Sequence, residues 1–223
     1  MSEAQFSVEG VLDALAMQPR RHDGAGRAIM FVAARSLEGT TTAARAVANI
    51  AGPGAVYAID LDIRRNALAR ALSEDGGLGP RIEGDLNGTR FYSVRDLPEP
   101  PPAFFYHRVG RSRVYAGVFD MRLLPAGARV GISSRPDYWD VARAGGAFVV
   151  VDAPALEHSS IALRVAPHMD GVVLVVGAGR GAAPAALDAK EMLIEAGANL
   201  MGLVYAGADA PVAAIDRLLR QAG

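Results

Sequence analysis

The chain has 223 residues, 51% of them hydrophobic, which is enough to bury the core of one large domain. Its formal net charge of -1 comes from acids and bases mixed along the sequence, so no basic stripe predicts binding to nucleic acid. The absence of cysteine excludes disulfides and thiolate metal sites, and the four histidines lack the spacing of metal ligands.

We expect residues 1–26 to form an N-terminal helix or extension, and residues 27–223 to form a single domain. The N-terminal stretch begins with acids where a secretory signal carries basic residues. The longest apolar run starts at Gly171 and is broken by glycines and Arg180, well short of the roughly 20 residues that a bilayer requires. The sequence therefore predicts a cytoplasmic protein that does not insert directly into a membrane.

Five short apolar runs, rich in β-branched residues, are expected to be buried strands. In chain order they are AIMFVAA (28–34), AVYAID (55–60), AFVVVDAP (147–154), GVVLVVGA (171–178) and LMGLVYAG (200–207). Helical patterns lie between them, at residues 40–52, 64–77 and 182–199. This alternation predicts an α/β fold in which a mostly parallel sheet carries helices on both faces.

The middle of the chain, from residue 76 to residue 146, follows a different pattern. Its proline cluster at residues 98–102 predicts an extended loop. Two alternating aromatic runs follow, joined through residues 110–112, and they predict strands at the edge of the sheet. Residues 133–146, SSRPDYWDVARAGG, predict a helix with a serine cap.

The stretch FVAARSLEGTTTAARAVANIAG, from Phe31, has the pattern of a strand, a glycine turn and a helix. A phosphate-binding loop of the form G-x-x-x-x-G-K-[ST] uses backbone amides and a lysine to hold phosphates, and a hydroxyl to hold Mg²⁺. Only Gly39 and Thr41 match that form, and Thr40 stands in the place of the lysine. On this pattern alone, an ordinary connection between a strand and a helix is the better interpretation.

Three aspartates make the pattern more specific. Asp60 and Asp62 follow the second expected strand, and Asp152 ends the third. Ligands bind at the carboxyl ends of the strands in open parallel sheets, so these side chains are expected to lie near the loop. Each aspartate alone is as well explained as a helix cap.

The three motifs together resemble those of the MinD/ParA class of deviant-Walker P-loop ATPases, and most closely those of the bacterial tyrosine kinases (BY-kinases) and their capsular and exopolysaccharide relatives. That family reads like SARPGEGKTTTAANLA, LLIDADLRRPSL and VIIDTPP, where this chain has AARSLEGTTTAARAVA, YAIDLDIRRNAL and VVVDAPAL. The similarity runs from about Arg27 to Gly207. It implies a P-loop NTPase fold of the SIMIBI type.

The resemblance also implies a role for each matching residue. Thr41 corresponds to the hydroxyl that holds Mg²⁺, and Asp152 to the carboxylate behind that metal. Thr42 corresponds to a phosphate contact. Asp60 and Asp62 correspond to residues that orient water or a second hydroxyl.

The departures from the family imply degenerate nucleotide chemistry. Thr40 replaces the lysine, Leu37 replaces a glycine, and Tyr205 stands where the family has an asparagine that reads adenine. Arg35, at the position of the extra lysine of the class, is the residue that offers a replacement charge. Losing a charge-assisted bond to phosphate weakens binding roughly ten- to a hundredfold. A leucine in a left-handed turn costs roughly 1 to 2 kcal/mol. We therefore expect no cofactor, or at most weak binding of ATP and Mg²⁺.

The resemblance leads to one main functional hypothesis and two alternatives. The main hypothesis is a pseudokinase-like adaptor that docks on a membrane polysaccharide co-polymerase or export protein and regulates surface polysaccharide synthesis. The first alternative is a divergent active ATPase or tyrosine kinase, and the second is a MinD/ParA-like positioning protein. A homodimer is left open, although the N-terminal region lacks the kinases' ring-forming Glu/Arg pattern and the C-terminus lacks their tyrosine cluster. Without a nucleotide, Asp60 and Asp152 are expected to cap helices or loops, at around 1 kcal/mol each.

Overall fold

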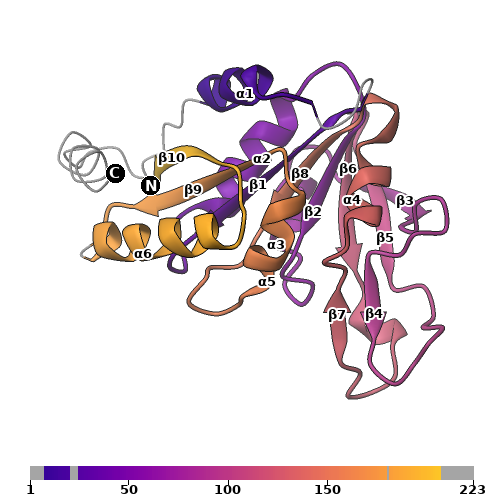
Figure 1. The fold of residues 1–223 in the computed structure, drawn as a ribbon. Helices are drawn as coiled ribbons and strands as arrows, with labels where there is room; N and C mark the ends of the chain where they lie inside the picture. The colour runs from indigo at the N-terminus through magenta and orange to yellow at the C-terminus, as the bar shows by residue number, and fades with distance from the viewer. Residues whose placement is uncertain (1–7, 21–24, 180, 207–223) are drawn as a thin grey trace.

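The computed structural model describes residues 8–20, 25–179 and 181–206, and an eight-stranded sheet forms its centre (Figure 1). The strands follow the order β10-β9-β1-β8-β2-β6-β5-β3. They are β1 (Arg27–Ala33), β2 (Val56–Asp60), β3 (Leu78–Glu83), β5 (Phe104–Val109), β6 (Val114–Phe119), β8 (Phe148–Asp152), β9 (Gly171–Gly177) and β10 (Leu200–Ala206). The expectations for residues 1–7 and 207–223 fall outside the described residues.

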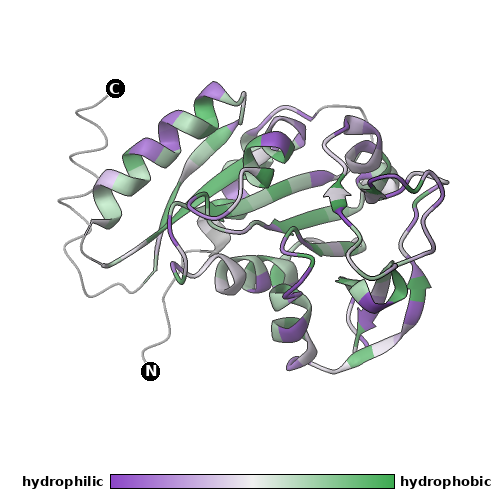
Figure 2. Ribbon diagram, turned by 90° about the horizontal axis from the view of Figure 1, so that it is seen from below, coloured by the Kyte–Doolittle hydropathy of each residue, from purple (hydrophilic) through white to green (hydrophobic). Residues whose placement is uncertain are grey.

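The six strands from β10 to β6 run parallel, whereas β5 and β3 are antiparallel additions at one edge. The predicted mostly parallel sheet is thus confirmed, and so is the expectation that the aromatic runs form strands at its edge. The parallel strands β1, β8 and β9 are almost entirely buried, because helices cover both of their faces. Figure 2 shows this hydrophobic character along the central strands.

The helices divide between the two faces of the sheet and close a core on each. They are α1 (Val8–Met17), α2 (Thr40–Ile50), α3 (Ala67–Ser73), α4 (Pro136–Ala142), α5 (Ile161–Val165) and α6 (Ala182–Glu195), with 3₁₀ turns η1 (Met121–Leu123), η2 (Ala144–Gly146) and η3 (Ala166–His168). One core cluster joins α1, α2 and α3 to the sheet, and the other joins α4, α5 and α6. Within the described ranges, no helix has the length and apolar character needed to cross a membrane.

A second, two-stranded sheet pairs β4 (Tyr92–Val94) with β7 (Val130–Ile132). It projects beyond the lower right of the main sheet in Figure 1. The predicted loop with the proline cluster follows β4 and leads back to β5. This arrangement leaves a junction between the projecting pair and the carboxyl end of β2.

The serine cap predicted for the helix within residues 133–146 is wrong. The residue at the N-cap of α4 is Arg135, whose side chain makes no capping hydrogen bond. Pro136 occupies the first helical turn, where its fixed φ favours the helix and its missing N–H needs no acceptor. The proline, rather than a serine, sets where this helix begins.

Candidate functional site

The carboxyl ends of β1, β2 and β8 surround a cavity of about 600 Å³. Eight of the nine residues that the sequence analysis proposed line it: Arg35, Gly39, Thr40, Thr41, Thr42, Asp60, Asp62 and Asp152. Tyr205 is not among the lining residues; it lies on β10, where its backbone pairs with that of Val176 on β9. The structure therefore brings together the motif residues but not the residue at the adenine-reading position.

The loop before α2 contains two residues in the left-handed backbone conformation. Leu37 has a φ of 65° and Gly39 a φ of 92°. The Leu37 side chain is 103% exposed, so it avoids the interior of the loop by projecting into solvent. A non-glycine residue in this conformation costs about 1 to 3 kcal/mol, and such strain tends to occur at functional positions.

Two amides of this loop bind carboxylates of the chain itself. The N–H of Arg35 donates to Glu38 Oε2 at 3.1 Å, and the N–H of Ser36 donates to Glu157 Oε1 at 2.6 Å. The Ser36 hydrogen bond is the main reason why the pKa of Glu157 lies below its ordinary value. In a working phosphate loop, such amides point at the phosphates. Here both amides are bonded to carboxylates, which lie outside the set of residues that line the cavity.

Glu38 is held firmly in this arrangement. Its side chain is almost fully buried, with 8% of the residue exposed. Its Cγ lies 3.1 Å from the place where a Cβ on Gly177 would be, so a larger residue at 177 would press on it. The close approach of β9 thus depends on glycine at this position.

The position expected for a metal contains two buried carboxylates. The hydroxyl of Thr41 donates to Asp152 Oδ2 at 2.6 Å, and Asp152 pairs in register with Asp60 on the neighbouring strand. Burial raises the pKa of Asp152 to about 8, and the negative charge of Asp60 adds to this. Burial also raises the pKa of Asp60 to about 6, although hydrogen bonds from the backbone amides of Leu68, Asp62 and Ala67 oppose it.

Asp60 has the capping role that the sequence suggested, and Asp152 has a different one. Asp60 accepts the N–H of Asp62 at 2.7 Å and the N–H of Leu68, in the first turn of α3, at 3.2 Å. Asp152 is bonded instead to the Thr41 hydroxyl at the start of α2. It joins the loop to the sheet rather than ending a helix.

The cavity offers oxygen atoms of the kind that bind Mg²⁺. A hydroxyl and carboxylates are the ligands that Mg²⁺ takes, and Thr41 and Asp152 would hold it. However, across the described ranges no group of three acidic, histidine or cysteine side chains is arranged to hold a metal. Further ligands would have to come from water and phosphate.

The cationic side chains that line the cavity are Arg35 and Arg65. Its lining has three aspartates but no lysine, and Arg65 lies 3.6 Å from Asp62 Oδ2 in an ion pair. The Arg35 guanidinium reaches the start of α6, where its Nη1 lies 3.4 Å from the place of a Cβ on Gly181.

Sequence reasoning missed two of the residues that shape this site. Glu38 and Glu157 were not singled out, because neither belongs to a motif position with its own chemistry. Glu157 lies 121 residues from the amide that it accepts, and no local spacing indicates such a contact. The only sequence signal for Glu157 was that an acidic residue stands five positions after Asp152 without belonging to a motif.

Comparisons with known proteins identify relatives in structure only. No protein-family model and no curated protein matches the sequence. The kinase domain of the Escherichia coli tyrosine kinase ETK superposes with a TM-score of 0.56 and 18% identity, over 89% of this chain and 73% of that chain. The chimerical protein CapA2B2 superposes with a TM-score of 0.55 and 13% identity, over 89% of this chain and 82% of that chain. The predicted fold, that of a BY-kinase domain, is thereby confirmed.

Proposed function

We propose that this chain is a pseudokinase-like adaptor with the BY-kinase fold, working without a bound nucleotide. It docks on a membrane polysaccharide co-polymerase or export protein and regulates capsule or exopolysaccharide synthesis. It resides in the cytoplasm and reaches the membrane through that partner. One observation carries the proposal: the loop amides bind Glu38 and Glu157, while Thr40 occupies the place of the lysine.

A nucleotide would have to overcome three costs in this site. It would displace Glu157 from the Ser36 amide, and it would find no lysine to neutralise its phosphates. It would also approach the buried carboxylate of Asp60, which disfavours further negative charge unless Mg²⁺ accompanies it. The missing charge-assisted bond alone corresponds to roughly a ten- to hundredfold loss of affinity.

The docking part of the proposal is supported by Leu37. Its apolar side chain is fully exposed at the tip of the loop, in a backbone conformation that leucine disfavours. A strained, solvent-facing apolar side chain contributes nothing to the fold, and it suits contact with another protein. The same loop that contacts phosphates in a kinase would then contact the partner.

We expect copurification of the full chain with the polysaccharide co-polymerase of its own organism, to the same extent with or without ATP and Mg²⁺. Calorimetry is expected to detect no ATP or ADP binding at micromolar concentrations, for the wild-type chain as for Thr41→Ala. Leu37→Ser is expected to weaken the complex at least about tenfold, as the loss of a buried apolar anchor does. Micromolar ATP affinity that Thr41→Ala abolishes would contradict the adaptor assignment.

A second prediction concerns what would be needed to restore nucleotide binding. Thr40→Lys alone is expected to leave ATP binding undetectable, because Glu157 still occupies the Ser36 amide. Combining Thr40→Lys with Glu157→Gln removes the competing charge and is expected to give measurable Mg-ATP binding. Glu195→Gln, a change of an acid at the end of α6, is the matched control for the loss of one carboxylate. If Thr40→Lys alone binds ATP as well as the double variant, Glu157 does not block the loop.

The divergent ATPase or kinase is kept as a second candidate because part of the metal position is intact. Thr41 still donates to Asp152, and Asp60 still lies beside it. In this alternative, Arg35 or a partner residue supplies the missing cation. Hydrolysis of ATP by the wild-type chain with its partner present, abolished by Thr41→Ala, would favour this candidate over the adaptor.

A further inference from the structure

A second cavity lies away from the loop before α2 (residues 34–41, called the degenerate loop below). It is at the junction between the main sheet and the projecting β4–β7 pair. Its volume is about 700 Å³. One wall is the turn after β2, with Ile63 and Arg64, and the other is residues 121–130, which run from η1 into β7. Both the volume and the position at a junction of two structural units are typical of small-molecule sites, which measure roughly 300 to 1,000 Å³.

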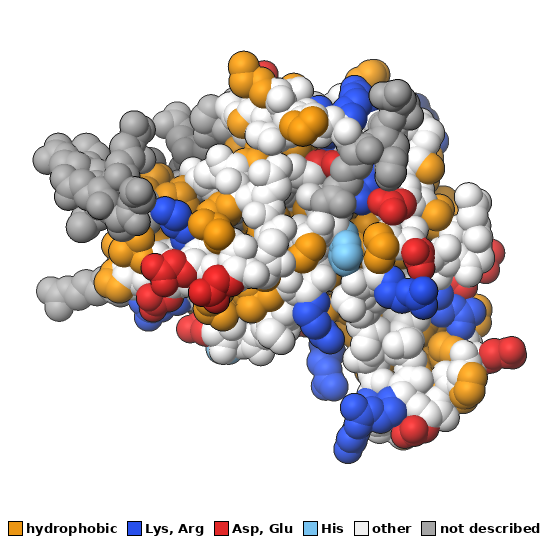
Figure 3. Space-filling model, viewed as in Figure 1, with side chains coloured by type: hydrophobic (Ala, Val, Ile, Leu, Met, Phe, Trp, Pro, Cys, Tyr) orange, Lys and Arg blue, Asp and Glu red, His pale blue; other side chains and the backbone are white. Residues whose placement is uncertain are grey.

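The charge of this cavity is entirely positive. Its lining contains Arg64, Arg122 and Arg129 and no acidic residue, although the whole chain carries a net charge of -1. Figure 3 shows basic side chains gathered over this part of the molecule, near the projecting pair. The neighbouring cavity at the degenerate loop has the opposite character, with three aspartates in its lining.

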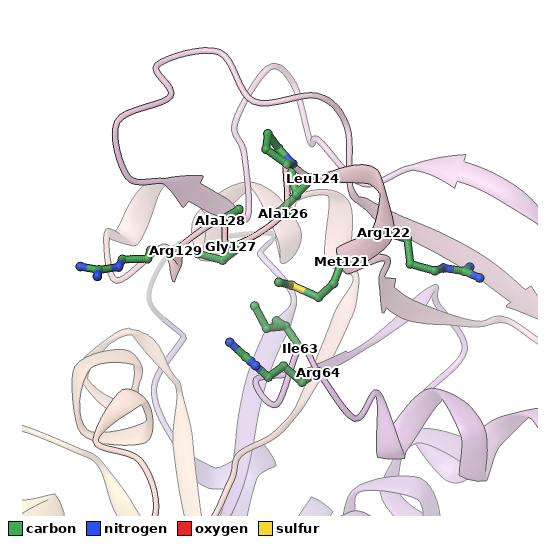
Figure 4. A pocket seen from close by; sticks show the side chains of 11 residues that line it. Ile63, Arg64, Met121, Arg122, Leu124, Ala126, Gly127, Ala128 and Arg129 are labelled. Atoms are coloured by element: carbon green, nitrogen blue, oxygen red, sulfur yellow. The ribbon is translucent and has the colours of Figure 1, made fainter.

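Two of the three arginines are available to a ligand. Arg122 is engaged by Asp120, at 2.8 Å from Nε to Oδ1. Arg64 and Arg129 are exposed, and in the part of the chain that the structure describes their guanidiniums make neither a hydrogen bond nor an ion pair. In Figure 4 both extend toward the same side of the cavity, whereas Arg122 points to the other side.

The cavity lining also contains apolar side chains, which lie to one side of these two arginines in Figure 4. Ile63 and Met121 face each other across the cavity in Figure 4. Leu124 also lines the cavity and is largely buried, with 7% exposed. Methionine adapts its shape to flat or irregular groups, so this surface suits a compact ring or short apolar chain.

We propose that this cavity binds an organic phosphate. Arg64 and Arg129 hold a phosphate or diphosphate group, and the apolar or ring-shaped body attached to it packs between Ile63 and Met121. Two guanidiniums balance a dianion, which a phosphate monoester is and a single carboxylate is not. The cavity is also much larger than inorganic phosphate requires, and its apolar surface accounts for the rest of the ligand.

Calorimetric titration of the full chain with phenyl phosphate, pyrophosphate and inorganic phosphate, at constant ionic strength, tests this site. Phenyl phosphate is expected to bind at least about tenfold more tightly than inorganic phosphate, because only the ester reaches the apolar surface. Arg64→Gln and Arg129→Gln are each expected to weaken its binding roughly ten- to a hundredfold. Arg64→Lys keeps the charge without the two-pronged geometry and is expected to give an intermediate loss.

The controls separate this cavity from the loop and from general charge effects. Arg111→Gln removes one exposed arginine from the turn between β5 and β6, outside the cavity, and is expected to leave binding unchanged. Thr41→Ala alters the degenerate loop and is also expected to leave it unchanged. Ile63→Ala should weaken the binding of phenyl phosphate but not that of inorganic phosphate. The proposal is overturned if no probe binds at millimolar concentrations, if Arg111→Gln costs as much as Arg64→Gln, or if binding depends on Thr41 instead.

Discussion

Arg143→Met is expected to lower the free energy of unfolding by about 3 to 5 kcal/mol, the usual cost of removing one partner from a buried ion pair. Arg143 Nη1 lies 3.0 Å from Asp170 Oδ2, and both side chains are 1% exposed. Methionine replaces much of the arginine's volume but leaves the buried Asp170 without its ion-pair partner Arg143. The measurement is urea denaturation followed by circular dichroism.

The effect is large because Arg143 joins three separate parts of the fold. Its Nη2 donates to Asp140 within α4 and to the backbone carbonyl of His168 in η3. Asp170 in turn accepts the N–H of Ala28, at 2.7 Å, in the central strand β1. Losing the guanidinium therefore removes the donor of three hydrogen bonds, one of them to the buried carboxylate of Asp170.

The matched control is Arg135→Met, which removes an arginine from a pair at the surface. Arg135 lies 3.3 Å from Asp137, with side chains that are 82% and 56% exposed, so its loss is expected to cost at most about 1 kcal/mol. Adding Asp170→Asn to Arg143→Met should restore part of the stability, because it removes the buried charge that the arginine balanced. Equal costs for Arg143→Met and Arg135→Met would show that the buried pair contributes little.

The parallel core of the fold could be predicted from the sequence because its central strands β1, β8 and β9 are buried on both faces. Runs such as AFVVVDAP and GVVLVVGA carry that burial as continuous apolar sequence. The edge strand β3, LGPRIE, was not predicted, since it is mostly exposed, contains a proline and shows no clear alternation. Its place beside β5 is determined by tertiary pairing, which local sequence does not record.

The residues of the candidate site could be predicted only where chemically functional side chains stand at the ends of strands. Asp60 and Asp152 end adjacent parallel strands, so their proximity follows from the topology. The contact of Glu157 with the Ser36 amide depends instead on how two loops meet in space. The arginine-lined cavity likewise combines residues from two distant segments, neither of which has a motif of its own. At Leu37 the sequence is misleading in the opposite way. The surrounding loop imposes a left-handed backbone conformation that leucine itself disfavours.

Stability is expected to fall as the pH rises from about 4 to about 8, because the folded chain holds a proton on Asp152 that the unfolded chain has lost. The pKa of Asp152 is raised from 3.8 to about 8 on folding, and that of Asp60 to about 6. A carboxyl group with a raised folded pKa favours the folded state below its unfolded pKa, and this contribution is lost as the pH rises through the folded value. Each such group contributes a slope of up to about 1.4 kcal/mol per pH unit.

Asp152→Asn tests this directly, because asparagine keeps the size of the side chain and an oxygen that accepts the Thr41 hydroxyl. The variant is expected to have a flatter stability curve and to exceed the wild type at pH 8 by at least about 2 kcal/mol. A simple capping role predicts the opposite sign, namely a modest loss. Denaturation curves at several pH values between 5 and 8 distinguish the two, and Asp137→Asn, at an exposed position, controls for the loss of one carboxylate.

The same experiment, repeated with Mg²⁺, shows whether the carboxylate pair still serves a metal. A bound cation would favour the ionised form of Asp152 and would raise the melting temperature at pH 8 in the wild type but not in Asp152→Asn. The adaptor proposal leads us to expect no such rise, since the pair then acts only within the fold. A wild-type curve that is level between pH 5 and pH 8 without metal would mean that Asp152 is ionised in the folded chain, with the Thr41 hydrogen bond outweighing its burial.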